Sequence, residues 1–234
     1  MTWFEELAEF MGPAYLRYSF TKGTEQEVGF LVDVLGLRAG HRVLDVGCGP
    51  GRHAHALARR GVVVHGVDIS PRFVDLARAG AAAGATFEVA DARGLSFDGE
   101  FDAAISLCQG GFGLLGDDDP AVLAGMARAV RPGGRLAVTA FSAYFAVRFL
   151  EAGDEFDADS GVSHERTTIR NEAGDAREAD LWTSCFTPRE LRLLCERAGT
   201  IVDGIFAVRP GEYGAAPPDL DHPEWLVICT RPGR

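Results

Sequence analysis

A short apolar segment, three glycines at alternate positions and the start of an amphipathic segment follow one another in VLDVGCGPGRHAHALARRG, residues 43–61. Glycine is needed where the backbone takes a positive φ or where another group approaches the main chain too closely for a Cβ. The segment therefore predicts a tight turn from a buried strand into a helix. Because the first N–H groups of a helix attract negative charge, we expect a carboxylate or phosphate of a ligand at this turn.

The spacing of the glycines bears on which ligand the turn binds. Gly47, Gly49 and Gly51 form G-x-G-x-G, whereas dinucleotide enzymes use G-x-G-x-x-G, which would require glycine where Arg52 stands. An NAD-type oxidoreductase is thus disfavoured but stays an alternative. A glycine-rich turn alone is also common in purely structural loops, so its context has to decide.

Five apolar runs alternate with amphipathic stretches, at residues 41–46, 62–67, 87–89, 103–107 and 135–140. Strands that are apolar throughout are typical of a parallel sheet covered by helices on both faces. With 234 residues and 47% hydrophobic content, the chain has material for one such α/β domain with a small addition. After a helix that starts with a capping box at Thr187, residues 201–208 and 224–230 are predicted to be two final strands that pair antiparallel.

Four parts are predicted along the chain. Residues 1–36 form a helical cap with aromatic side chains at Tyr15, Tyr18 and Phe20, and residues 37–141 form a cofactor-binding core. Residues 142–186 are a lid, because alternating polar and β-branched residues on either side of 172–175 predict a hairpin. Residues 187–234 complete the core. The hairpin is expected to lie above the carboxyl edge of the sheet without joining it.

Acidic side chains stand at the ends of the first three predicted strands. Asp68 ends the second strand, where an acid can accept hydrogen bonds from both hydroxyls of a ribose, and Asp91 follows the third, in reach of an exocyclic amino group. Asp45, just before the glycines, can orient the loop or receive the amino group of a ligand. Each acid alone is also typical of a residue that caps the next helix. Together they indicate a nucleoside site.

Charge and composition limit the partners. A net charge of −11 disfavours nucleic acid, and the longest uncharged stretch, residues 103–116, is shorter than the roughly 20 apolar residues of a membrane span. The acidic N-terminus is unlike a signal peptide, and the five cysteines include no CxxC pair, so a cytoplasmic protein is expected. His53 and His55 point to different sides of a helix, and no metal is expected.

The segments LDVGCGPG, GVDIS, ADARGL, FDAAISL and RPGGRLAV, in this order, resemble the motifs of class I S-adenosylmethionine-dependent methyltransferases. The resemblance implies a Rossmann-like sheet of seven mostly parallel strands, of which the last is antiparallel, and S-adenosylmethionine as the cofactor. It implies that the glycine turn, including Cys48, faces the methionine part together with Leu107. It also implies that Asp68 binds the ribose, and that Ile69, Asp91 and Ala92 border the adenine.

The expected reaction is in-line methyl transfer to a small-molecule acceptor by a monomer or homodimer. Since a good nucleophile needs only positioning and exclusion of water, no catalytic base is required. His164 in the lid and Gln109 after the fourth strand are the candidate catalytic residues, and His53 is expected near the cofactor carboxylate. Two roles stay open for the aromatic side chains around the lid, which either line an apolar acceptor pocket or pack the hairpin against the sheet: Phe141, Tyr144, Phe145 and Trp182. A regulatory protein that binds the cofactor without turnover stays open as an alternative.

Overall fold

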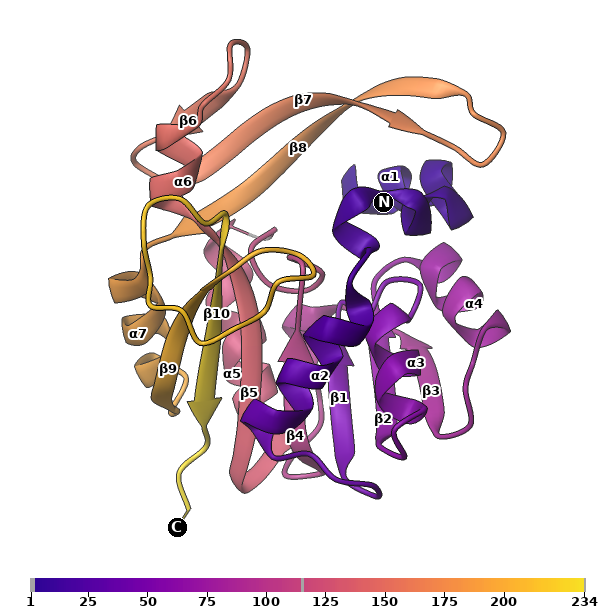
Figure 1. Ribbon diagram of the computed structural model, residues 1–234, viewed down its shortest axis with the longest axis vertical. Coiled ribbons are helices and arrows are strands. Elements are labelled where there is room, and N and C mark those ends of the chain that lie inside the picture. Colours follow the sequence, from indigo (N-terminus) through magenta and orange to yellow (C-terminus); the bar gives the residue numbers. More distant parts are fainter. Residues whose placement is uncertain (1–2, 115, 234) are drawn as a thin grey trace.

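The computed structural model describes residues 3–114 and 116–233, so the outer limits of the predicted first and last parts, residues 1 and 234, lie outside it. Its sheet contains a central set of seven strands in the order β3-β2-β1-β4-β5-β10-β9 (Figure 1). Their bounds are β1 Arg42–Val46, β2 Val63–Asp68, β3 Ala85–Val89, β4 Phe101–Ser106, β5 Val130–Ser142, β9 Ile201–Val208 and β10 Glu224–Thr230.

The first five of these strands pair parallel to one another, while β10 runs antiparallel between β5 and β9. This arrangement confirms the predicted Rossmann-like sheet with an antiparallel last strand. The carboxyl ends of β1, β2 and β4 consequently meet at one edge, together with the amino end of β10. That edge positions the candidate site.

Helices cover both faces of the sheet, as predicted. Side chains of α2 Thr24–Leu35, α3 Arg52–Ala58 and α4 Pro71–Ala79 form one buried apolar cluster with the strands. On the other face, α5 Asp119–Ala129 and α7 Pro188–Arg197 form a second cluster with the strands. Because β1 and β4 have a helix layer on both sides, they are buried along most of their length and can be apolar throughout.

Local signals in the sequence explain where these helices start. The side chain of Thr187 accepts the N–H of Glu190 at 3.2 Å, and the Glu190 carboxylate accepts the N–H of Thr187 at 3.0 Å. This reciprocal pair is the predicted capping box, and it satisfies two N–H groups that a helix start leaves free. The side chain of Ser70 caps α4 by accepting the N–H of Phe73 at 3.2 Å.

The segment between β5 and α7 contains the short helix α6 Ala143–Arg148 and three strands, β6 Glu155–Asp157, β7 Val162–Arg170 and β8 Ala176–Phe186. The prediction of a free hairpin was wrong in two respects. A third strand, β6, pairs with β7, and the end of β8 joins β5 through the pairs Phe141–Cys185 and Ser142–Phe186. The reason is that β5 extends beyond the end of β4, so its last residues are open to the returning strand. The sheet therefore has ten strands instead of seven.

The N-terminal helix α1 Trp3–Met11 lies under the arch formed by β7 and β8 (Figure 1). Leu7 and Met11 of this helix share a buried apolar cluster with Ile169 of β7. The Tyr18 hydroxyl accepts the backbone N–H of Arg170 at 3.0 Å. These contacts close the arch over the carboxyl edge of the sheet. No helix within the described residues is long and apolar enough to cross a membrane.

Candidate functional site

The glycine turn joins β1 to α3 with three residues in the left-handed region, at φ 70° for Gly47, 53° for Gly49 and 82° for Gly51. A Cβ at Gly47 would overlap the backbone of Gly110, which belongs to the loop after β4. At Gly49, by contrast, no atom lies within 4 Å of the position that a Cβ would occupy. Glycine is thus required at position 47 because the backbone of Gly110 leaves no room for a Cβ. At position 49 glycine is favoured by its positive φ alone, since the space beside it is open.

Asp68, the last residue of β2, holds this turn in place. Its carboxylate accepts the N–H of Gly49 and the N–H of Ser70, each at 2.8 Å, and only 2% of the residue is exposed. Burial raises the pKa of Asp68 to about 6, although these two N–H groups lower it in part. Asp68 therefore connects the second strand to the glycine turn, and each oxygen keeps a lone pair for a further donor.

A cavity of about 250 Å³ opens beside the turn, and we call it the loop cavity. Five of the residues that the sequence predicts for the cofactor line it together: Gly47, Asp68, Ile69, Asp91 and Ala92. The carboxylate of Asp91 already forms an ion pair with Arg93 at 2.6 Å, and this contact holds the pKa of Asp91 below its usual value. The edge thus brings together residues from the ends of β1, β2 and β3.

The other predicted cofactor residues do not line the loop cavity. Asp45 is buried, its Oδ2 has no hydrogen-bond partner among the described residues, and burial raises its pKa to about 7. Cys48 and Leu107 are also buried. Gly49 and Gly51 shape the backbone of the turn, and a Cβ at Gly51 would lie 2.8 Å from Nε2 of His55.

His53 takes part in a buried ionic contact behind the turn. Its Nε2 lies 2.7 Å from the carboxylate of Glu27 in α2, and Arg52 contacts the same carboxylate at 2.5 Å. Burial and the charge of Arg52 lower the pKa of His53 to about 4, so the ring is neutral near pH 7. Burial alone would raise the pKa of Glu27, but His53 and Arg52 outweigh it and lower the pKa. His53 thus ties α3 to α2 and does not line the loop cavity.

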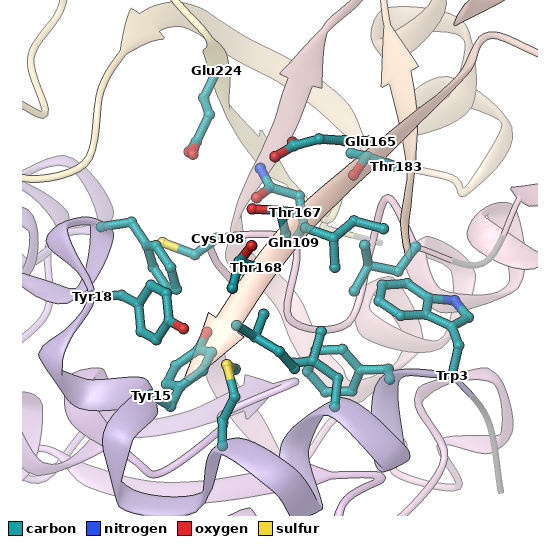
Figure 2. A pocket seen from close by; sticks show the side chains of 17 residues that line it. Trp3, Tyr15, Tyr18, Cys108, Gln109, Glu165, Thr167, Thr168, Thr183 and Glu224 are labelled. Atoms are coloured by element: carbon teal, nitrogen blue, oxygen red, sulfur yellow. The ribbon is translucent and has the colours of Figure 1, made fainter. Parts of the chain in front are cut away.

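A second cavity of about 360 Å³ lies under the arch, and we call it the lid cavity (Figure 2). Its walls come from α1, from β7 and β8, from the loop after β4 and from the start of β10. Both cavities are lined by Trp3, Phe4 and Leu114, and Gln109 of the lid cavity precedes Gly110 of the loop cavity. The two cavities therefore adjoin at the end of β4.

The two candidate catalytic residues differ in position. Gln109 lines the lid cavity, and it and Cys108 both adopt the left-handed backbone region, at φ 53° and 52°. His164 does not line that cavity, since its Nε2 contacts Asp180 at 2.9 Å and its ring stacks on Trp182. Its neighbour Glu165 faces the cavity instead, because successive side chains of a strand point to opposite faces.

The aromatic lining also differs from the prediction. Phe141, Tyr144, Phe145 and Trp182 are absent from the lid cavity. The rings that line it are all N-terminal: Trp3, Phe4, Tyr15, Tyr18 and Phe20. One face of β7 packs against α1. The aromatic residues of the N-terminal segment therefore line the cavity.

Sequence reasoning missed Glu224, the first residue of β10. It is 5% exposed and lines the lid cavity, and burial raises its pKa to about 7. A signal for it does exist in the sequence, since an antiparallel last strand must begin at the edge where the parallel strands end. The first residue of EWLVICT is therefore placed at the site by topology alone.

Comparison with known proteins agrees with this geometry. Residues 43–134 match the family model described as a methyltransferase domain. The methyltransferase GfsG of Streptomyces halstedii is 38% identical over 115 residues, which cover 46% of this chain and 40% of GfsG. The chain thus spans less than half the length of the curated relatives it matches.

Solved structures share the fold over most of the chain. The CcbJ methyltransferase from Streptomyces caelestis has a TM-score of 0.75 at 20% identity and covers 90% of each chain. CalS10 from Micromonospora echinaspora, described as an amino pentose methyltransferase with bound S-adenosylmethionine, has a TM-score of 0.65 at 22% identity and covers 99% of this chain and 97% of its own. Residues 43–134 therefore match a methyltransferase domain, and the chain shares its fold with solved S-adenosylmethionine-dependent methyltransferases.

Proposed function

We propose that this protein transfers a methyl group from S-adenosylmethionine to a small-molecule acceptor. The observation that carries the proposal is the pair of adjoining cavities at the carboxyl edge of the sheet. One is lined by Gly47, Asp68 and Asp91, and the other lies under the arch of β7 and β8. Two reactants can meet where the cavities adjoin, at the end of β4.

The residues of the loop cavity fit the parts of S-adenosylmethionine. Asp68 offers buried carboxylate oxygens for ribose hydroxyls, and Ile69 and Ala92 offer apolar contact for the adenine ring. The open space at Gly49 and the unpartnered Oδ2 of Asp45 are suited to the amino acid end of the cofactor, which carries an ammonium group. A buried acceptor without a donor is costly, so a bound ammonium would relieve that cost.

When bound, S-adenosylmethionine supplies an electrophilic methyl group on a sulfonium sulfur. The chain contributes binding and alignment, which correspond to effective molarities on the order of 10⁵ M or more. The contacts of Leu7 and Met11 with Ile169 close the arch and keep competing water from the reacting groups. Opening of the arch is then required for the acceptor to enter and the product to leave.

The alternatives predict different ligands and products. An NAD-type oxidoreductase would bind NADH more tightly than S-adenosylhomocysteine, and a regulatory protein would bind the cofactor but methylate nothing. The cytoplasmic location, the exclusion of nucleic acid and the monomeric or homodimeric state expected from the sequence belong to this proposal as well. The exclusion of nucleic acid rests on the charge of −11, and the cytoplasmic location rests on the composition.

Turnover tests the proposal directly. The protein is incubated with methyl-deuterated S-adenosylmethionine and a metabolite extract, and small molecules that gain the labelled methyl group are detected by mass spectrometry. We expect at least one labelled product, together with S-adenosylhomocysteine in equal amount. Cofactor binding without any labelled product would instead support the regulatory alternative.

A further inference from the structure

The lid cavity is apolar over most of its wall. Leu7 and Met11 come from α1, and Ile169 and Leu181 come from β7 and β8. Rings of Trp3, Tyr15 and Tyr18 add flat surface on the N-terminal side (Figure 2). Such a wall favours an acceptor with an apolar body, because burying apolar surface stabilises binding.

All charged side chains that line the lid cavity are acids. Glu165 reaches it from β7 and Glu224 from the start of β10, and no lysine, arginine or histidine is among the lining residues in the described part of the chain. Burial and the neighbouring acids Asp154 and Glu151 raise the pKa of Glu165. The charged groups on the wall therefore disfavour an anionic acceptor, whereas a cation would meet two carboxyl groups. The guanidinium of Arg52, which contacts Cys108, is the one positive charge that acts on Glu224 among the described residues.

The buried carboxyl group of Glu224 is incompletely satisfied, although the side chain of Gln109 lies close enough to lower its pKa in part. Its Oε2 has no hydrogen-bond partner among the described residues, and Nε2 of Gln109 lacks one too. Figure 2 shows the carboxyl group of Glu224 pointing into the cavity, toward the side where Gln109 and Cys108 lie. An unsatisfied buried polar group destabilises the folded protein. A ligand that donates hydrogen bonds at this point would remove the cost.

We propose that the lid cavity selects an acceptor with an apolar body and a basic amine, and that Glu224 receives the amine. The inference rests on the proposed function and names its substrate class. An aliphatic amine is more basic than a carboxylate, so it enters as the ammonium ion and Glu224 as its counter-ion. The rings of Tyr15, Tyr18 and Trp3 add attraction for a cation near their faces.

Glu224 then acts as the proton acceptor. The bound ammonium gives one proton to the Glu224 carboxylate, which frees the nitrogen lone pair. That pair forms a bond to the methyl carbon while the sulfur–carbon bond breaks and its electron pair passes to sulfur. The product is an N-methylated ammonium ion and S-adenosylhomocysteine. Glu224 returns its proton to solvent once the arch opens.

Three probes with one carbon skeleton separate charge from shape: 3-phenylpropylamine, 3-phenylpropan-1-ol and 3-phenylpropanoate. Their dissociation constants are measured by calorimetry at about pH 8, with the protein saturated with S-adenosylhomocysteine. We expect the amine to bind at least about tenfold more tightly than the alcohol, and the carboxylate to bind more weakly than both.

Two variants assign the preference to its residue. Glu224→Gln should reduce the preference for the amine to less than about threefold and leave the affinity for the alcohol within about threefold. Glu196→Gln, a matched change on the exposed side of α7, should leave all three affinities unchanged. If the Glu224 variant does not fold, the ratio of the amine and alcohol affinities of the wild-type protein still tests the inference.

An alcohol that binds as tightly as the amine, a carboxylate that binds best, or no binding by any probe below about 10 mM would overturn the inference. Failure of the proposed function is a separate result, because it would show as no binding of S-adenosylhomocysteine before any probe is added. Cofactor binding without a preference for the amine would leave the proposed function standing and refute only the amine class.

Discussion

Replacing Glu224 by glutamine removes a titration that the structure predicts to destabilise the folded protein as pH rises. Burial moves the pKa of this carboxyl from its usual value of 4.5 to about 7. Between these two pH values the unfolded chain releases the proton while the folded chain keeps it. The folded state then binds more protons, so the free energy of unfolding of the wild type falls as pH rises, by about 1.4 kcal/mol per unit.

Over this window the loss amounts to about 3 kcal/mol for a fully buried group. Two other buried acids act in the same direction, since burial raises the pKa of Asp45 to about 7 and that of Asp68 to about 6. His53 acts in the opposite direction, because its lowered pKa of about 4 favours the folded state as pH rises. These contributions are common to the wild type and Glu224→Gln, so they cancel in the difference between the two proteins.

Urea unfolding at about pH 5 and about pH 8 measures this difference. We expect Glu224→Gln to gain about 2–3 kcal/mol on the wild type between the two pH values. Glu196→Gln controls for the loss of one negative charge at an exposed position. If the Glu224 variant and the wild type changed in parallel, the carboxyl would ionise equally in both states, and the argument from its burial would be wrong.

Four further substitutions test local contacts of the fold by urea unfolding. Gly47→Ala should lower the free energy of unfolding by about 3–4 kcal/mol, because the new Cβ combines a positive φ with overlap against Gly110. Gly49→Ala, whose Cβ meets open space, should lower it by about 1–2 kcal/mol. Equal costs would contradict the backbone contact between Gly47 and Gly110. Thr187→Ala removes one half of the capping box and should cost about 1 kcal/mol, and an unchanged midpoint would mean that the cap contributes nothing. Glu27→Gln leaves buried Arg52 without its counter-charge and should cost about 3 kcal/mol, a value that a solvated pair would not reach.

The sheet was predictable because its signals are local. Apolar runs, the glycines at 47, 49 and 51 and the capping box at Thr187 each act within a few residues, and the order of parallel strands follows from short connections. The extension of β5 to Ser142, which allows β8 to join the sheet, has no such local signal. The pairing of β8 with β5 depends on how far these two strands extend beyond the end of β4.

The candidate site was predictable only where chain order fixes position. Asp68, Ile69, Asp91 and Ala92 follow strands that end at one edge, and all four line the loop cavity. The lining of the lid cavity depends on which face of β7 packs against α1. Glu165 lies on that face and lines the cavity, whereas the predicted His164 lies on the other face. Burial of Asp45 and His53 depends in the same way on packing between elements distant in the chain. Their roles as cofactor contacts remain predictions.

The most direct test of the account is a calorimetric titration of the protein with S-adenosylhomocysteine. The wild type should bind it with a dissociation constant of about 10 µM or lower and should bind NADH far more weakly. Asp68→Ala should weaken binding by at least about tenfold while its circular dichroism shows a folded protein, and Asp33→Ala on the exposed side of α2 should bind like the wild type. Equal affinity of the wild type and the Asp68 variant, or tighter binding of NADH, would contradict the claim that these strand ends bind the adenosine of the methyl donor.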